Sequence, residues 1–246
     1  MCNPVVVVTF RERGMAIPIE SSPPPGWDRD GIDGLLGLFP PGRLSEVVGP
    51  RSSGASSLLL AFIARITASG GGQVAYVDGM DALDPASAVA TGADLSALLW
   101  VRCGGRLRVA LSAADLLARC PGFALVVLDL DELGPVPASA HIRLQRAVEG
   151  GDTILIVRSA RHREGSPASL VLATRRLAPR WIGLRLLTRL AGLRSEVSVF
   201  RSRVPLTLSP RGRGQGEGAG GEGAGGEGAG GEGAGGEGRW TLDWTL

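Results

Sequence analysis

Residues 44–69 read LSEVVGPRSSGASSLLLAFIARITAS, and this stretch predicts a strand, a glycine loop and a helix in succession. LSEVVG (44–49) is a short apolar strand, and residues 56–69 have the apolar composition of a buried helix. Between them, Gly49 is followed by four residues and then Gly54, which is the spacing of a phosphate-binding loop. Such a loop directs backbone N–H groups and the start of the next helix at phosphate.

The loop lacks the residue that does its chemistry. Ala55 occupies the position at which a phosphate-binding loop carries lysine. All 26 positions held by lysine or arginine are arginine, so codon usage alone would favour arginine here and keep the charge. The lysine normally follows the β and γ phosphates through hydrolysis, and alanine cannot. Arg51 is a poor substitute, because a guanidinium inside the loop is expected to point to solvent.

Other residues typical of a nucleotide site are present in the sequence. The hydroxyl of Ser56 is a Mg²⁺ ligand in such loops. Asp129 ends an apolar run, FALVVLD (123–129), where a second metal-holding carboxylate is expected, the alternative being an ordinary strand-end cap. We therefore expect no bound cofactor or metal, with weak binding of ATP and Mg²⁺ left open. The residues expected to form this degenerate site are Gly49, Pro50, Arg51, Ser52, Ser53, Gly54, Ala55, Ser56, Ser57 and Asp129.

Strand and helix patterns alternate as far as residue 158, which predicts an α/β fold. The unbroken apolar run at 123–129 is typical of a strand covered on both faces of a parallel sheet. We predict a doubly wound, mostly parallel sheet with helices on both faces. Strands are expected at 44–49, 73–78, 98–102, 123–129 and 153–158, and helices at 56–69, 84–92, 105–119 and 138–149. Strand-like segments at 169–177, 184–190 and 197–203 predict an antiparallel extension at one edge.

The chain divides into four parts by composition. Residues 1–38 form an N-terminal segment and 39–213 form the core. Residues 214–238 repeat GEGAG, and this glycine and glutamate content predicts an extended, flexible linker. The last part, RWTLDWTL (239–246), alternates apolar and polar residues, which predicts a strand that returns to the core. The alternative is a tethered peptide that docks on a partner.

Charge is concentrated in the middle of the chain. Residues 139–213 hold fifteen arginines and four acidic residues, whereas the segments before and after are acidic overall. This block can face an anionic partner, either DNA or an acidic protein surface, although a solvated arginine-rich surface is the alternative. Trp181 and Phe200 are the main aromatic residues of the block, too few for a base-stacking platform. The candidate contact residues are Arg158, Arg161, Arg163, Arg175, Arg176 and Arg180.

Several classes of protein are disfavoured by composition. Three cysteines without a Cys-x-x-Cys pair and two histidines support neither a disulfide framework nor a zinc site. The longest apolar run, LLLAFIA (58–64), is seven residues, far below the roughly 18 that cross a membrane. The N-terminus is a poor secretory signal, because its valine run is short and no basic residue precedes it. We expect a cytoplasmic protein without a membrane partner.

The stretch at 39–102, from FPPGRLSEVVGPRSSGASS through YVDGMDALDP to LLWVR, is similar to the ATP-binding core of the bacterial recombinase RecA. The likeness continues more weakly to residue 210 and through the last strand. The resemblance implies a catalytic glutamate at position 80 and a phosphate-sensing glutamine near position 160, but Met80 and Ala160 stand there. The loops that hold single-stranded DNA in RecA also look changed, at 133–139 and 160–169. With the lysine gone as well, three departures that serve one reaction predict that hydrolysis is lost.

A RecA-like chain of about this length, with an ATP site that has lost its catalytic residues, resembles the ImuA family. The resemblance implies a non-catalytic accessory protein in the DNA damage response and in error-prone translesion synthesis. It also implies RecA and an ImuB-like relative of Y-family polymerases as partners. An arginine-rich DNA-binding module, a SulA-like cell-division inhibitor and an ATP-dependent recombinase remain as alternatives.

Overall fold

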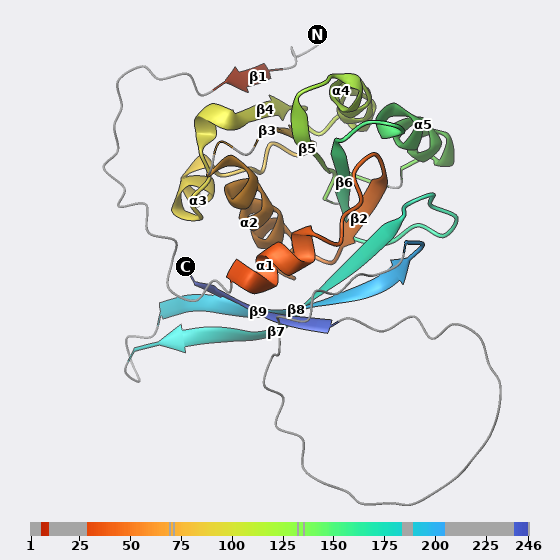
Figure 1. Cartoon of the computed structure of the whole chain (residues 1–246). Coiled ribbons are helices and arrows are strands. Elements are labelled where there is room, and N and C mark those ends of the chain that lie inside the picture. The colour runs from red at the N-terminus through yellow and green to blue at the C-terminus, as the bar shows by residue number, and fades with distance from the viewer. Residues whose placement is uncertain are drawn as a thin grey trace, which may run out of the picture.

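The described part of the chain forms one twisted sheet of nine strands with helices on both faces (Figure 1). The strand order is β1-β4-β3-β5-β6-β2-β7-β8-β9. The computed structural model describes residues 6–9, 29–68, 70, 72–131, 133–134, 136–183, 189–204 and 239–245. The glycine and glutamate repeat at 214–238 and most of the N-terminal segment lie outside these residues.

Six neighbouring strands run parallel, which confirms the predicted α/β class. These strands are β2 (Leu44–Val48), β3 (Gln73–Asp78), β4 (Leu98–Arg102), β5 (Phe123–Asp129), β6 (Ile154–Ser159) and β7 (Leu170–Ile182). β2 to β6 and the first residues of β7 are largely buried, because their apolar runs leave neither face of the sheet suited to water, whereas β7 is exposed from Arg175 onward.

The helices cover the two faces unequally. On one face lie α1 (Arg29–Leu36), α2 (Ala55–Thr67) and α3 (Pro85–Ala90), and on the other lie α4 (Leu107–Arg119) and α5 (Ala138–Val148) (Figure 1). Each face has its own apolar core, with α2 almost wholly buried in the first. None of the helices within the described ranges is long and apolar enough to cross a membrane.

Helix α3 begins where the sequence predicts, at the N-cap Asp84. The carboxylate of Asp84 accepts hydrogen bonds from the backbone N–H groups of Ala86 and Ser87. These bonds satisfy two of the N–H groups that the first turn leaves free. The Ser87 hydroxyl also donates to Asp84, and this bond, together with the two backbone bonds, lowers the pKa of Asp84.

Antiparallel strands lie at both edges of the sheet, where the sequence predicts them at only one. β1 (Val6–Thr9) pairs with β4. It has only four residues, and so short an apolar run does not distinguish a strand from a loop in the sequence. At the other edge β8 (Arg189–Ser202) pairs with β7, and β9 (Arg239–Thr245) pairs with β8. Of the strand expected at 184–190, residues 184–188 lie outside the described part and the last two begin β8.

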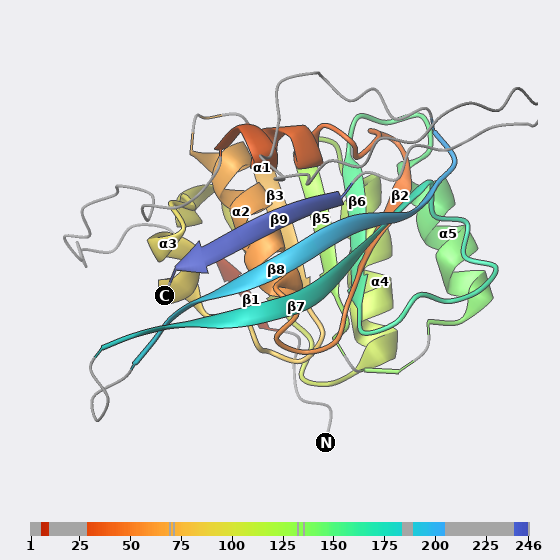
Figure 2. The same ribbon diagram turned by 90° about the horizontal axis from the view of Figure 1, so that it is seen from below.

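The ribbon of β7, β8 and β9 curves over α1 and α2 (Figure 2). Leu172, Val197 and Leu242 bury their side chains in the same core as these helices. β7 pairs with β2 only from Leu170 to Ala173 and then runs on beside β8 alone. We call the extended part, Arg175–Ile182 with Leu190–Arg194, the β7–β8 arm.

Candidate functional site

The glycine loop connects β2 to α2 at the carboxyl edge of the sheet, as the spacing predicts. Gly54 has a φ of 94° and immediately precedes the first residue of α2. The N–H groups of a first helical turn have no carbonyl partner within the helix, so they are available to an anion. At the start of the loop, a Cβ on Gly49 would stand 2.1 Å from Thr174 Oγ1, so only glycine fits beside β7.

The side chains of the loop provide no free cation above its amides. Ala55 is buried, with 2% of its surface exposed. The Ser53 hydroxyl lies 2.7 Å from Thr174 Oγ1, which donates a hydrogen bond to the carbonyl of Val48. Arg51 is 67% exposed and pairs with Asp131 at 3.4 Å. What remains for a phosphate group is the backbone and the outer serine hydroxyls at 56 and 57.

Asp129 is fully engaged by protein groups. Its Oδ2 accepts from the Tyr76 hydroxyl at 2.5 Å, and its Oδ1 accepts from Arg158 Nη1 at 3.0 Å and from the backbone N–H of Asp131 at 3.1 Å. Burial raises the pKa of Tyr76 well above its ordinary value, and the charge of Asp129 raises it further. The strand-end carboxylate therefore stands in an internal network with no oxygen left unbonded.

The cation of this network is Arg158, which the sequence placed among the DNA- or partner-binding candidates. That expectation was wrong, because only 5% of Arg158 is exposed. Arg158 lies opposite Asp129 in the parallel pairing of β6 with β5, and its Nη1 lies 2.7 Å from Asp131 Oδ1. Burial by itself lowers the pKa of Arg158, but the charges of Asp129 and Asp131 outweigh it and raise the pKa. The guanidinium is therefore a fixed positive charge between two carboxylates beside the glycine loop.

The resemblance to RecA implies a catalytic glutamate at a position that carries Met80, followed by Asp81. Met80 is 45% exposed. The neighbouring Asp81 has a φ of 58°, and its carboxylate accepts from Gly104 N at 3.0 Å and from Arg102 Nη2 at 3.2 Å. These two bonds hold Asp81 to the start of the next crossover. Ala160, at the position of the sensor, contributes only its backbone N–H, which donates to the carbonyl of Asp131.

The other candidate arginines fall into two separate groups. Arg161 and Arg163 lie on the exposed loop after β6, and Arg163 donates to the carbonyl of Val136. The arm carries the second group, Arg175, Arg176 and Arg180, all exposed. Within it, Arg175 pairs with Glu196 of β8 at 3.3 Å.

Residues 25–139, which include the glycine loop and the acidic strand end, match the RecA N-terminal domain. The core is RecA-like. Protein RecA of Corynebacterium urealyticum is 43% identical over 94 residues, which are 38% of this chain and 25% of that protein. Protein RecA of Thermus aquaticus is 40% identical over 101 residues, which are 40% of this chain and 29% of that protein. The chain thus spans about a quarter of the length of these relatives.

The fold of the RecA-like core extends beyond the part with sequence identity. A crystal structure of the RadB recombinase superposes with a TM-score of 0.51 at 19% identity, covering 69% of this chain and 87% of that one. This likeness establishes the arrangement of the sheet and its helices. The RecA-like fold and the antiparallel edge strands agree with the architecture predicted from the sequence.

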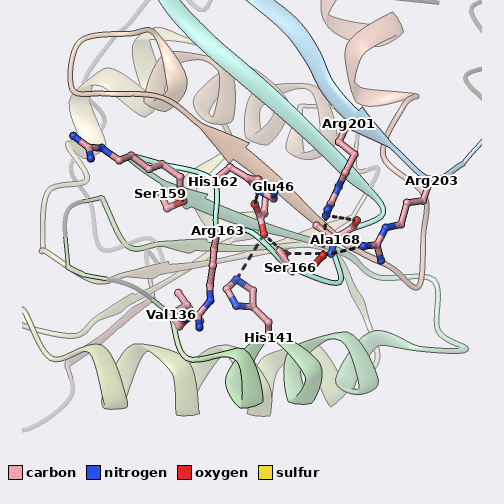
Figure 3. Close-up of polar contacts among 11 residues, drawn as sticks. Glu46, Val136, His141, Ser159, His162, Arg163, Ser166, Ala168, Arg201 and Arg203 are labelled. Atoms are coloured by element: carbon pink, nitrogen blue, oxygen red, sulfur yellow. Dashed lines mark hydrogen bonds and ion pairs between the residues drawn. The ribbon is translucent and has the colours of Figure 1, made fainter. Parts of the chain in front are cut away.

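A second buried cluster of the RecA-like core, not predicted from the sequence, is centred on Glu46 (Figure 3). Glu46 lies in the middle of β2 and is 2% exposed. Its carboxylate accepts a hydrogen bond from the Ser166 hydroxyl, lies 2.6 Å from His162 Nδ1, and lies 3.6 Å from His141 Nε2. Both histidines of the chain therefore meet at one carboxylate. The sequence did carry one signal for this cluster, because Glu46 is a charged residue within a strand that is buried on both faces.

This cluster anchors residues 160–169, the loop between β6 and β7. From the other side, Arg201 donates to the carbonyls of Ser166 and Ala168 at 2.8 and 3.2 Å. Arg203 donates to the carbonyl of Ser166 at 3.2 Å (Figure 3). The loop is thus fastened to β2, α5 and β8 rather than left open along its length. Within the described part of the chain, no group of three or more His, Cys, Asp or Glu side chains is arranged to hold a metal ion.

His141 makes the stability of the RecA-like core depend on pH. Burial lowers the pKa of His141 below its ordinary value of 6.5; the charge of Glu46 opposes this shift, and the charges of Arg163 and His162 add to it. The folded state therefore favours neutral His141, whereas the unfolded chain takes up the proton near pH 6.5. The stabilisation is fully present above pH 6.5 and is lost as the pH falls below it, by at most about 1.4 kcal/mol per pH unit.

Urea unfolding at about pH 7.5, 6.5 and 5.5 measures this dependence. We expect wild-type protein to lose stability toward pH 5.5, and His141→Gln to lose less over the same interval. Equal slopes for the two proteins would show that another group is responsible.

Proposed function

We propose that the chain is a non-catalytic, RecA-like accessory protein that acts by binding partner proteins. The observation that carries this proposal is the position of Arg158, which supplies a fixed cation to Asp129 and Asp131. In a working site, the strand-end carboxylate helps to hold Mg²⁺ and a loop lysine follows the phosphates. Here an internal guanidinium engages the carboxylate, and Ala55 has no charge to offer.

The remaining parts of the reaction support the same proposal. Met80 cannot activate water, and Asp81 is held by Arg102 and by the amide of Gly104. The loop amides keep a geometry that suits an anion, so weak binding of ATP is compatible with the proposal while turnover is not. The fold is retained without the residues needed for ATP hydrolysis, which favours a role in binding.

The resemblance to the ImuA family suggests the process and the partners. We propose that the protein works in the cytoplasm, in the DNA damage response and in SOS-type translesion synthesis. Its proposed partners are RecA and an ImuB-like relative of Y-family polymerases. A SulA-like inhibitor of cell division receives no support from the RecA-like core. A true recombinase would need a cation and a base that the loop and its neighbours do not supply.

Measurement of ATP hydrolysis, with RecA from the same organism as the positive control, tests the loss of catalysis. We expect no turnover above background, with or without single-stranded DNA. Restoring the lysine in Ala55→Lys is expected to leave turnover absent, because Arg158 still engages Asp129 and no base faces the water. Hydrolysis by the wild-type protein at a rate typical of recombinases would overturn the proposal.

Binding is measured separately, by calorimetric titration with Mg·ATP and then with RecA or the ImuB-like protein. Saturable binding of either protein, with weak or no heat from nucleotide, is the expected result. Tight nucleotide binding would instead mean that the loop senses ATP and that partner binding is switched by it. Failure to bind either protein would contradict the accessory role.

DNA binding is the second candidate function, because residues 139–213 carry fifteen arginines against four acidic residues. Phosphate contacts release counterions, so the logarithm of the affinity for a DNA oligonucleotide should then fall linearly with that of the salt concentration. A flat salt dependence would exclude this function for the arginine-rich block.

A further inference from the structure

The β7–β8 arm is the most exposed part of the described sheet. After Ala173 the strand β7 leaves its parallel neighbour β2 and continues beside β8 alone. Every residue from Arg175 to Gly183 is exposed. The arm begins next to the glycine loop, because Thr174 packs against Gly49 and hydrogen-bonds to Ser53. Trp181 lies seven residues beyond Thr174, roughly 23 Å along an extended strand, so the end of the arm reaches away from the glycine loop.

Large apolar side chains are exposed on this arm without a role in either core. Trp181 is 59% exposed, Ile182 43%, Leu177 40% and Leu190 39%. Further along the ribbon, Leu193, Val197 and Val199 already supply its contact with the α1 and α2 core. Apolar side chains gathered on a surface mark a site of interaction more often than singly scattered ones do. Tryptophan and arginine are also the residues most enriched among those that dominate binding energy.

The charge of the arm has one sign. The arm includes four arginines, at 175, 176, 180 and 194, and no acidic residue. Arg175 is paired across the ribbon with Glu196, which lies outside this segment. Arg176 is exposed and makes no ion pair within the described part of the chain. A surface that combines exposed apolar side chains with the exposed cation of Arg176 is complementary to an apolar surface that has acidic groups at its edge.

The arm suits a folded protein surface better than a nucleic acid strand or an added β-strand. Single-strand platforms stack successive bases on several aromatic rings, and Trp181 is the only aromatic residue between 175 and 194. Pro179 lacks an N–H group, and register shifts between Arg176 and Ala178 and between Arg180 and Trp181 interrupt the edge. Both features oppose pairing with another strand, so side chains would make the contact.

We propose that the β7–β8 arm docks on an acidic surface of the partner protein, with Trp181 inserted into an apolar socket and Arg176 facing acidic groups at its rim. This inference rests on the proposed accessory function and names the surface that performs it. It leaves the opposite face of the sheet, covered by α4 and α5, free of contact.

The test compares arm variants with matched variants on α4. Trp181→Ala and Arg176→Glu change the arm, whereas Leu116→Ala and Arg108→Glu change exposed residues of α4 in the same two ways. The probes are purified RecA and the ImuB-like protein from the same organism, with the full chain immobilised. We expect each arm variant to weaken binding of one of these proteins at least tenfold. The α4 variants should stay within about twofold, and all four should keep the wild-type unfolding midpoint, because the side chains are exposed.

The alternative occupants have distinct outcomes. Arm variants that bind both proteins within twofold of wild type would overturn the inference while leaving the accessory function intact. If the arm variants lost only their binding to a labelled oligo(dT), the arm would be a nucleic-acid-binding surface. If they lost only self-association, the arm would contact a second copy of this chain. Wild-type protein that binds neither probe would refute the proposed function and this inference with it.

Discussion

Replacing Arg158 with methionine is expected to lower the free energy of unfolding by about 3–5 kcal/mol. Methionine keeps much of the side-chain length but removes the cation that lies 3.0 Å from Asp129 Oδ1 and 2.7 Å from Asp131 Oδ1. Both carboxylates are more than nine-tenths buried and would remain without their countercharge. A buried charge left unpaired costs more than the original pair contributes. Chemical denaturation at pH 7 measures the loss.

Arg161→Met is the matched control for this experiment. Arg161 lies three positions further on and is exposed, so the same substitution there should change the free energy of unfolding by about 0.5 kcal/mol or less. A change below about 1 kcal/mol for Arg158→Met would contradict the network. In that case Asp129 would have another partner, and the argument against Mg²⁺ binding would lose its main support.

Glu46→Leu is expected to cost about 3 kcal/mol or more. The substitution removes the acceptor of the Ser166 hydroxyl and the partner of His162 Nδ1, and it leaves polar atoms buried beside an apolar side chain. Because these contacts fasten the loop 160–169, its release should also make the flexible backbone at Arg161 and Arg163 easier for trypsin to cleave. Unfolding midpoints and the rate of tryptic cleavage at these two arginines measure the two effects.

Two further variants distinguish the role of Glu46 from a general loss of packing. Glu46→Gln keeps an oxygen acceptor and should cost less than leucine. Glu164→Leu changes an exposed acid of the same loop and should leave both stability and cleavage close to wild type. Unchanged cleavage in Glu46→Leu would show that Arg201 and Arg203 hold the loop without help from β2.

The strand, loop and helix order was readable because each element carries a local signal. Gly49 and Gly54 fixed the loop, the apolar runs fixed β3 and β5, and Asp84 fixed the start of α3. Two elements were not predicted from the sequence. β1 is four residues long, and α1 lies in a segment that the patterns did not resolve, since a short element acquires its structure mainly from what it packs against.

The sites were less predictable than the fold, because they depend on contacts between distant residues. Arg158 followed a strand end, where a ligand-facing loop is the usual expectation, yet its register opposite Asp129 turned it inward. Glu46, His141, His162 and Ser166 are spread over 120 residues, and no spacing in the sequence connects them. The exposed arm was visible only as an arginine-rich segment with a tryptophan.

By itself, the sequence determined the α/β alternation, the glycine loop and the missing charge at Ala55, because these depend on residues close together in the chain. The tertiary structure alone decided what replaces that charge and what holds the loop after β6. Parallel pairing of β5 with β6 sets Arg158 against Asp129, and β2 lies between β6 and β7, where Glu46 reaches both histidines. Burial then makes these pairings strong, since charges removed from water must be matched where the fold places them.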